Sequence, residues 1–541
     1  MKKNSFIQGT IIASVSIIIV KLLGALYVIP FYKIIGEQGG TLYSYAYNIY
    51  NLFLNISTAG IPLAISMLIS EFNTLKKFDA KERTYKIGKN LILIFSSICF
   101  IVIFLFSKQI AFFLTSGLTG NNTLDDISLC IKAISLCLLV TPLLSVLRGY
   151  FQGHKYITPT SISQVIEQII RIIIVLLGSY ISLNVLHTKL SIGVSISLLG
   201  AFFGALFSFI YLKLKAKKNK ELFNEVKEKD EITNKEIFKR IISYCIPIIL
   251  VAVVQNIYDT VDLKLIIKGL NMIGYDKSEV EIIGSVIVTW GPKICMIIVA
   301  ISMGLSTSLI PHMVSNYVEN DMKEVNRKFN QSISTMIITT LPMAIAIIFL
   351  SKEVYYLFYG ESLYGGLVLK YLAVVNIFLG ILTVINTALQ GMKKFKIIYI
   401  NTITGLVINA LLDIPLVLLF NKIGLTPYVA TIIATIIGCI TSYIVVLIYL
   451  NRSLEFNYKL VVKTLKKLLV PSISMCVVLF VLKHFITLKL NYINAIITIF
   501  FFGVISFAVY LYLSYKNGIL QEVLSKEYIN RILKKLRLKK G

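Results

Sequence analysis

The sequence predicts an all-α integral membrane protein with about fourteen transmembrane helices. Hydrophobic residues fill 56% of the 541 positions and charged residues only 15%, whereas soluble domains hold about a quarter charged residues. Apolar runs of about 18 residues or more recur along the whole chain, and each is long enough to cross the hydrocarbon core as a helix. These two observations together exclude an ordinary soluble globular protein.

Polar loops divide the apolar runs into the predicted spans. In order from the N-terminus the spans are 8–33, 43–71, 90–115, 127–149, 160–184, 190–212, 241–267, 281–312, 330–357, 365–389, 397–420, 425–450, 466–486 and 492–515. Because fourteen is an even number, both termini are expected on the same side of the membrane.

The distribution of basic residues predicts which side that is. With the N-terminus in the cytoplasm, the inner loops hold about 39 Lys and Arg residues and the outer loops about 8. Basic residues gather in cytoplasmic loops of membrane proteins, so both termini are predicted to be cytoplasmic. The same rule accounts for the net charge of +27, and no nucleic-acid partner is expected.

An internal repeat predicts the domain organisation. LRGYFQGHK (147–155) and INTALQGMK (385–393) both place Gln-Gly before a lysine at the end of a span. We therefore expect two pseudo-symmetric six-helix lobes, and transporters commonly bind substrate where such repeats meet. The predicted divisions are an N-terminal lobe (1–212), a charged cytoplasmic linker (213–240), a C-terminal lobe (241–451), and two extra transmembrane helices with a basic cytoplasmic tail (452–541).

Two smaller patterns concern packing and the membrane surface. GAFFG (200–204) has the GxxxG spacing, which indicates ordinary close packing of helices. The tail 520–540 has apolar residues at helical spacing and many cations, so it is expected to lie on the inner membrane surface, attracted to anionic lipid.

No pattern for catalysis or for a metal is present in the sequence. The seven cysteines lie in or beside apolar segments without a CxxC or Cys/His cluster, so we interpret them as small buried hydrophobic residues. There is no P-loop, HExxH or GxSxG motif. We therefore expect a transporter, not an enzyme, with no cofactor.

Two lysines inside predicted spans carry the strongest functional signal, because a cation in the hydrocarbon core is costly. Lys21 lies midway along the first span and Lys293 lies within the eighth. Neither has an acidic neighbour three or four residues away. If each half of the repeat contributes one lysine to a shared cleft, the cleft would suit a phosphate group. The alternative is that each lysine pairs with an acid from another helix.

Other ionisable residues within the spans leave two interpretations open. Glu167 and Arg171 are four residues apart on one helix face, so they form either a structural ion pair or part of the cavity. Asp259 and Asp262 share a face of the seventh span and are candidates for ion coupling, or are solvated or paired with nearby lysines. Asp413 lies in the eleventh span without an assigned role.

At this point three stretches resemble a known family. KLLGALYVIPFYKIIGEQGGTLYSYAYNIYNLFLNISTAGIPLAIS (21–66), LRGYFQGHKYITPTSISQVIEQIIRI (147–172) and SLIPHMVSNY (308–317) are similar to the polysaccharide-transporter branch of the MOP exporter superfamily. Within it they resemble the group of stage V sporulation protein B and the MurJ-type lipid II flippases.

The resemblance implies a fold and a site. Members have two six-helix lobes around a central cavity, with two extra helices thought to guide the lipid tail. Lys21 stands at the position of a cation before a Leu-Gly pair, Lys293 matches a basic position, and Asp259 matches an acid. Gram-negative members carry a second cation where this chain has Tyr27 and Val28. This chain would therefore bind diphosphate with a different set of cations, for which Arg171 is a candidate.

The resemblance also implies a function. We expect a monomeric flippase in the bacterial plasma membrane that moves an undecaprenyl-diphosphate-linked peptidoglycan precursor, lipid II, to the outer leaflet by alternating access. The role would be cell-wall or spore-cortex synthesis. Its partners would be the lipid-linked glycan and membrane lipid, and the driving force Na+ or H+ coupling or the membrane potential. The alternatives are a flippase for another lipid-linked polysaccharide unit, a cation-coupled multidrug exporter, and a scaffold without transport.

Overall fold

The computed structural model describes most of the chain. The described residues are 12, 16, 19–21, 23–24, 26–58, 60–115, 120–154, 156–219, 231–296, 298, 317, 320–392, 394–486 and 488–520. Every regular element in these ranges is helical, which confirms the predicted all-α class. Ten helices in the same ranges are long and apolar enough to cross a membrane. Residues 1–288 form one compact unit and 289–541 another.

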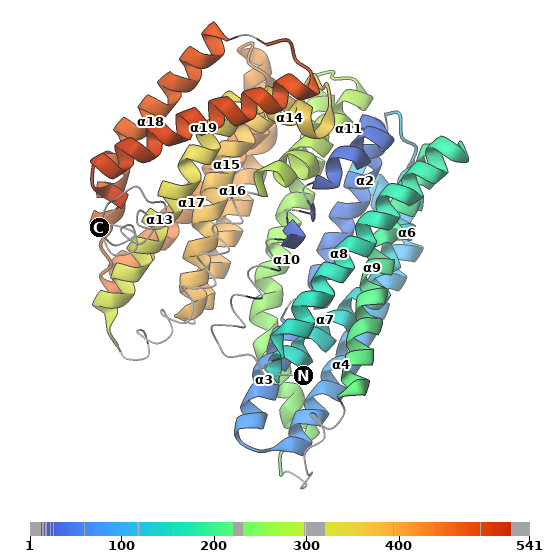
Figure 1. Ribbon diagram of the computed structural model, residues 1–541. Coiled ribbons are helices and arrows are strands. Elements are labelled where there is room, and N and C mark those ends of the chain that lie inside the picture. The colour runs from blue at the N-terminus through green and yellow to red at the C-terminus, as the bar shows by residue number, and fades with distance from the viewer. Residues whose placement is uncertain are drawn as a thin grey trace. The chain divides into compact units, whose positions relative to one another are not determined.

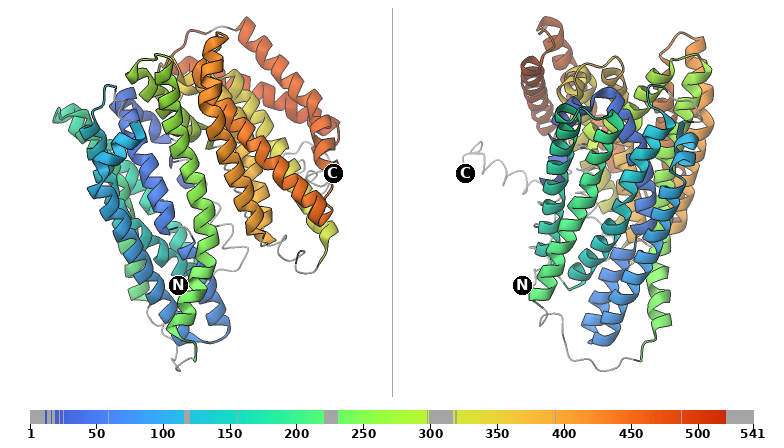
Figure 2. Two further views of the ribbon diagram at one scale, coloured as in Figure 1. Left: turned by 180° about the vertical axis from the view of Figure 1, so that it is seen from behind. Right: turned by 90° about the vertical axis from the view of Figure 1, so that its right-hand side faces the viewer.

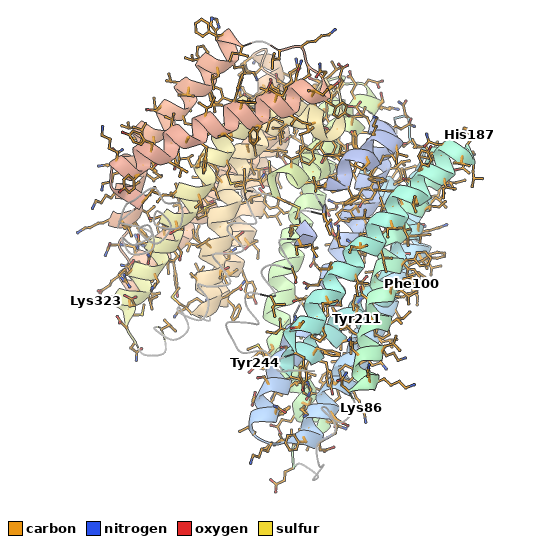
Figure 3. The ribbon with its side chains drawn as sticks, in the orientation of Figure 1. Lys86, Phe100, His187, Tyr211, Tyr244 and Lys323 are labelled. Carbon is orange, nitrogen blue, oxygen red and sulfur yellow. The ribbon has the colours of Figure 1, made fainter. Side chains whose placement is uncertain are left out.

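The first unit consists of helices throughout its described part (Figure 1). Their bounds are α2 Val28–Thr58, α3 Ile61–Thr74, α4 Phe78–Leu105, α5 Ser107–Thr115, α6 Leu124–Ser135, α7 Cys137–Gly153, α8 Ile157–Tyr180, η1 Ile181–Val185, α9 Leu190–Lys218, α10 Asn234–Met272 and α11 Lys277–Ser285. The π-helical turn η3 (Val286–Trp290) follows α11. Figure 3 marks the two ends of this unit: Lys86 and Tyr244 lie toward one end, and His187 lies at the other.

Glycines set the helix boundaries at the start of this unit. Helical residues fill most of the predicted loop 34–42, but the backbone of Gly36 (φ 65°, ψ −175°) is not helical, so two helices meet there and the predicted break between the first two spans is present without a long loop. The predicted span 43–71 is not one continuous helix, since Gly60 at φ 84° separates α2 from α3. Glycine adopts positive φ without steric cost, and Pro62 in the first turn of α3 suits a helix start.

The GxxxG pattern at 200–204 brings α9 close to α8, as predicted. A Cβ atom on Gly204 would lie 2.6 Å from the carbonyl oxygen of Glu167, and one on Gly200 would lie 2.9 Å from that of Arg171. A second pair with the same spacing, Gly149 and Gly153 of α7, meets the backbone of α3 in the same way. Backbones this close require residues without side chains.

Helix α10 packs along much of the first unit, as its course in Figure 2 shows. Ile237 and Ile241 belong to a buried cluster with residues of α3 and α4. Arg240 pairs with Glu71 of α3 at 2.9 Å. Further along, the Thr260 hydroxyl donates to Asn48 Oδ1 of α2 at 2.9 Å. The predicted division at residue 241 follows the sequence repeat, whereas these contacts group α10 with the first unit.

The second unit is a further set of packed helices. Their bounds are α13 Met322–Phe349, α14 Ser351–Tyr359, α15 Gly365–Gly391, α16 Phe395–Lys422, α17 Pro427–Leu454, α18 Lys459–Phe485 and α19 Tyr492–Lys516. Helices α16 and α17 form a close hairpin in which Gly405 meets Ser442 and Gly438. The last two helices, α18 and α19, pack on each other and on α13 and α14 respectively (Figure 1).

The contact between α8 and α9 yields a stability prediction. Gly204→Ala places a methyl group against the Glu167 carbonyl oxygen, and such overpacking typically costs about 1–3 kcal/mol. Gly503→Ala in α19 is the matched control, because its Cβ has no neighbour within 4 Å. We expect a lower thermal unfolding temperature for the purified Gly204→Ala protein alone. Equal unfolding temperatures in the two variants would contradict the close contact.

Candidate functional site

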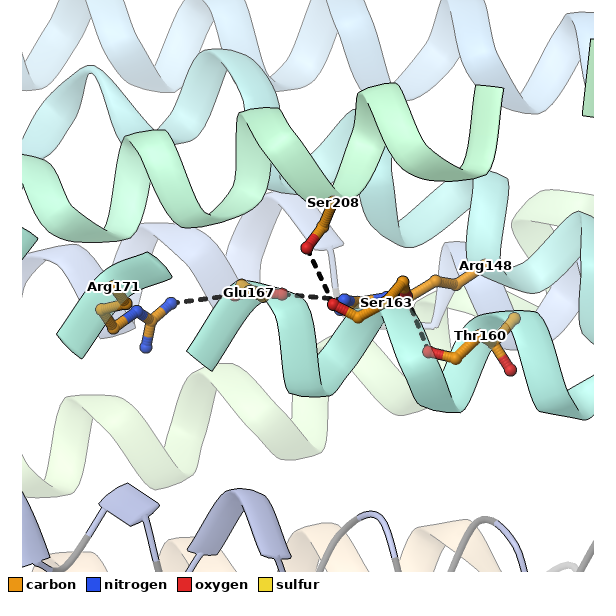
Figure 4. Close-up of polar contacts among 6 residues, drawn as sticks. All are labelled: Arg148, Thr160, Ser163, Glu167, Arg171 and Ser208. Carbon is orange, nitrogen blue, oxygen red and sulfur yellow. Dashed lines mark hydrogen bonds and ion pairs between the residues drawn. The ribbon is translucent and has the colours of Figure 1, made fainter. Parts of the chain in front are cut away.

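A network of one carboxylate and two guanidinium groups lies inside the first unit (Figure 4). Glu167 Oε2 forms an ion pair with Arg148 Nη2 at 2.9 Å, and Glu167 Oε1 accepts a hydrogen bond from Arg171 Nη2 at 2.9 Å. The ion pair that the spacing of Glu167 and Arg171 permits is therefore formed. Arg148 adds a second cation from α7.

Hydrogen bonds from two neighbouring helices position this network. Arg148 Nε donates to Ser163 Oγ of α8 at 2.8 Å, and Ser163 Oγ donates in turn to the Thr160 carbonyl oxygen at 2.6 Å. From α9, Ser208 Oγ donates to the Ser163 carbonyl oxygen at 2.7 Å. Figure 4 shows these contacts converging on one stretch of α8, so three helices hold the Arg148 guanidinium.

The network carries an excess positive charge. Its side chains are largely withdrawn from solvent, with 16% of Arg148, 14% of Glu167 and 22% of Arg171 exposed. One carboxylate faces two guanidinium groups, and guanidinium groups stay protonated in proteins. The three residues thus carry a net charge of about +1 in a largely buried setting, which is an arrangement suited to attracting an anion.

Arg148 was not among the site residues predicted from the sequence. The sequence could have predicted its position, because only residues 154–156 separate α7 from α8. Two helices joined by so short a connection run antiparallel. That arrangement places Arg148 of α7 opposite Ser163 of α8. Glu167 lies one turn after Ser163 in the same helix.

Tyrosine residues of the first span and α2 lie near the Arg171 end of the network. Arg171 lies within electrostatic range of the phenols of Tyr27, Tyr47 and Tyr50. Tyr43 and Tyr47 stack at 5.4 Å between ring centroids, and the phenol groups of Tyr27 and Tyr43 are hydrogen-bonded. The surroundings of Arg171 are therefore aromatic with polar edges.

Lys21 belongs to a helical stretch that runs beside α8. A Cβ on Gly24 would lie 3.3 Å from Gln168 Nε2, and Tyr27 interacts with Arg171. Gly24 therefore lies beside Gln168 of α8, and Tyr27 lies near Arg171 one turn further along. The two helices thus run in the same direction. Lys21 is one turn before Gly24 on the same face, so this register sets it near the turn of α8 that precedes Gln168. Lys21 itself is half-buried.

Lys293 belongs to the second unit, so its predicted pairing with Lys21 stays a prediction. The Lys293 ammonium lies 4.0 Å from the centroid of the Trp290 ring, a cation–π contact. The Trp290 ring is buried and packs edge-on against Tyr359 at 5.5 Å. Tyr359 also donates its hydroxyl to the Trp290 carbonyl oxygen at 2.8 Å. The indole ring under Lys293 is thus positioned by two contacts with Tyr359.

The acidic candidates have different surroundings. Asp262 of α10 is buried, with 8% of the residue exposed, whereas the Asp259 side chain lies outside the described part of the structure. In the second unit Asp413 is fully buried in α16, one turn after the equally buried Asn409. Within the described residues no group of three or more His, Cys, Asp or Glu side chains could hold a metal ion.

Two protein-family models match the chain in succession. Residues 6–271 match the model described as "Polysaccharide biosynthesis protein". Residues 283–414 match the model described as "MatE". The first match contains the whole Arg148–Glu167–Arg171 network, and the second contains Lys293 and Asp413.

Individual relatives match between two thirds and nearly all of the chain. The Lipid II flippase MurJ of Bacillus subtilis (strain 168) is 30% identical over 536 residues, which is 97% of this chain and 97% of the relative. Stage V sporulation protein B of the same organism is 24% identical over 372 residues, 67% of this chain and 68% of the relative.

A solved structure supports the same fold. The structure titled "Lipid II flippase MurJ, inward closed conformation" matches with a TM-score of 0.67 and 20% identity, covering 95% of this chain and 99% of that one. Together with the relative that is 30% identical over 97% of the chain, this agrees with the family that the three sequence stretches suggested. The chain belongs to the MurJ family of the MOP exporter superfamily.

Proposed function

We propose that this protein is a flippase that moves lipid II, an undecaprenyl-diphosphate-linked peptidoglycan precursor, from the inner to the outer leaflet by alternating access. The observation that carries the proposal is the similarity to the Lipid II flippase MurJ over 97% of both chains. The setting is the bacterial plasma membrane, with both termini cytoplasmic and fourteen spans arranged as two six-helix lobes plus two C-terminal helices. The protein acts as a monomer and serves cell-wall or spore-cortex synthesis.

The physical problem of this reaction is the charge of the diphosphate. An unshielded charge at the centre of the bilayer is strongly unfavourable. The Arg148–Glu167–Arg171 network offers one excess positive charge, and guanidinium groups bind phosphate oxygens in a bidentate manner. Lys21 adds a further cation from the helical stretch beside α8, one turn before Gly24. These groups give the diphosphate a polar path past the hydrocarbon.

Arg171 explains how the site works without a second cation in the first span. Tyr27 and Val28 occupy the place where Gram-negative members have that cation. Because Tyr27 interacts with Arg171 of α8, a positive charge reaches the same region from a different helix. We propose Lys293 as the cation that the second unit contributes, held by the Trp290 ring.

No cofactor is required for such transport. Outward movement of negative charge is favoured by an inside-negative potential, by about 2.3 kcal/mol per charge per 100 mV. Asp259 and Asp262 of α10 are our candidates for coupling a sodium ion or a proton to the return step, and the buried carboxyl of Asp413 is a further one.

A second candidate function is transport of another lipid-linked polysaccharide unit. The "Polysaccharide biosynthesis protein" model matches the half of the chain that contains the arginine network, and the diphosphate chemistry would be the same. A multidrug exporter fits less well, since cationic drugs would meet an excess positive charge at this network.

Complementation tests the function and the lysines together. In a strain depleted of its own lipid II flippase, we expect the wild-type chain to restore growth. Lys21→Ala and Lys293→Ala should reduce rescue to the level of an empty vector at equal membrane insertion, whereas Lys370→Ala, at an exposed lysine of α15, should rescue normally. A well-expressed wild-type chain that fails to rescue would reject lipid II as the substrate.

A pair of double variants separates binding from structure in the arginine network. Glu167→Gln/Arg148→Gln and Glu167→Gln/Arg171→Gln each leave one arginine and the same net charge. If Arg171 binds diphosphate, only the variant that retains Arg171 should flip lipid II in vesicles. Equal activity of the two variants would assign Arg171 a structural role. Glu167→Gln alone should lower stability by on the order of a few kcal/mol, because two cations lose their carboxylate.

Vesicle experiments distinguish the driving forces. An imposed inside-negative potential should increase outward flipping by the wild-type chain. We expect Asp259→Asn to abolish any additional effect of a sodium or proton gradient while the effect of the potential remains. Asp125→Asn, at a mostly exposed carboxylate paired with Lys108, is the control. A gradient effect that persists in Asp259→Asn would exclude Asp259 as the coupling group.

A further inference from the structure

A buried carboxylate lies near the beginning of α11. Glu281 is 4% exposed, and its Oε1 atom accepts a hydrogen bond from the Gly120 backbone N–H at 3.1 Å. Its Oε2 atom accepts one from Asn122 Nδ2 at 3.3 Å, and the Asn122 backbone N–H also faces the carboxylate. All three donors are neutral and come from the short loop that precedes α6. Among the described residues, the hydrogen-bond partners of Glu281 are thus the amides of this loop.

The same loop also meets the backbone of α11 directly. A Cβ atom on Gly120 would lie 2.6 Å from both the backbone nitrogen and the Cα atom of Ser278, in the first turn of α11. Backbone atoms within a helix cannot move aside as the tip of a side chain can, so only a glycine fits at this contact. The docking of the loop on α11 therefore depends on a close backbone contact as well as on a carboxylate.

Helix α2 holds the loop from another side. Gln38 Nε2 donates to the Asn121 carbonyl oxygen at 3.0 Å, and the Gln38 carbonyl oxygen accepts from Asn122 Nδ2 at 3.4 Å. The buried phenol of Tyr45, also in α2, is within electrostatic range of Glu281. Figure 1 shows α11 beside α2 near one end of the first unit. Three segments of this unit thus meet at one carboxylate.

These three segments come from different copies of the sequence repeat. Helix α2 and the loop belong to the first copy (1–212), whereas α11 belongs to the second copy, which starts at residue 241. The hydrogen bond from Thr260 of α10 to Asn48 of α2 joins the two copies in the same way. The positive-inside pattern predicts that the start of α11 faces the outside of the cell. The contact at Glu281 therefore joins the two copies at the predicted outer side.

We propose that Glu281, Gly120 and Asn122 form a latch that holds the two repeat copies together on the outer side, and that this latch opens when the substrate is released to the outer leaflet. The inference rests on the proposed function, because in alternating access the repeats separate on one side of the membrane at a time. Glu281 is a positioning residue in this role, since it holds the loop against α11. A carboxylate suits the role, because hydrogen bonds to a charged group are stronger than those between neutral groups.

Labelling of an engineered cysteine tests whether the latch opens. Ser285 lies one turn after Glu281 on the same face of α11 and is 2% exposed, so Ser285→Cys places a thiol of similar size behind the latch. Cells that express the full-length protein are treated from outside with a membrane-impermeant maleimide, and the rate of labelling is measured. The same variants without Ser285→Cys give the background from the native cysteines, which are buried in the first unit. A rise in this background would report unfolding.

Two variants should open the latch by different means. Glu281→Gln replaces one acceptor oxygen by an amide that faces other donors, whereas Gly120→Ala places a methyl group against the backbone of α11 without a change in charge. We expect each to raise the labelling rate of the Ser285→Cys protein roughly tenfold, because the closed state alone loses these contacts. The control is Glu279→Gln, which removes a half-buried carboxylate from the same helix and should leave the rate unchanged.

A double variant separates the specific pairing from a general loss of packing. In Glu281→Gln/Asn122→Asp, the amide at position 281 can donate to the carboxylate at position 122, while its oxygen still accepts from the Gly120 N–H. We expect the labelling rate to return toward that of the parent Ser285→Cys protein. The thermal unfolding temperature of each purified variant is measured alongside.

Three results would overturn the latch: an unchanged labelling rate in Glu281→Gln, an equal increase in Glu279→Gln, or a double variant that labels as fast as Glu281→Gln alone. The labelling does not require lipid II, so its result is distinct from that of the complementation test. A chain that labels as expected but does not restore growth would support the latch and reject the proposed substrate.

Discussion

The carboxylate of Glu167 is the group on which the interior of the first unit depends. It neutralises one of two guanidinium groups that would otherwise be uncompensated in a largely buried setting. The cost of an unpaired buried charge is several kcal/mol, so the positions of α7 and α8 are linked through this one residue. Helix α9 approaches the same turn because Gly204 lacks a side chain. The ion pairs of Glu167 join α7 to α8, and the contact at Gly204 joins α9 to the same turn of α8. Together they hold the three helices in place.

Local sequence rules predicted those features that depend on residues close in the chain. The helical class, the ion pair of Glu167 and Arg171, and the contact at Gly200 and Gly204 all follow from spacing along one segment. Arg148 was missed because its partner lies across a helix connection, and hydrophobic periodicity carries no information about such pairs. The helical residues on both sides of Gly36 within 34–42 were missed because glycines and polar residues there suggested a loop. The packing of α10 on α3 and α4 depends on tertiary contacts that no single segment encodes.

Basic residues in this protein are accommodated in three different ways. Arg148 and Arg171 share a carboxylate, Lys293 lies over the face of an indole ring, and three lysines at the start of α18, Lys459, Lys463 and Lys466, are exposed. The first two arrangements hold a cation in a fixed direction at low exposure. The third leaves the cations on the surface of the protein. These differences separate cations held in a fixed direction inside the protein from cations on its surface.

The course of the chain between α9 and α10 has a practical consequence. Lys218 ends α9 and Asn234 begins α10, and both helices belong to the first unit. The charged stretch between them therefore closes a loop within one unit, while the chain passes from one unit to the other near residue 288. The entropy of closing a loop grows only slowly with its length. A fluorescent domain or an affinity tag inserted between α9 and α10 would thus report on the intact protein without lengthening the covalent connection between its two units.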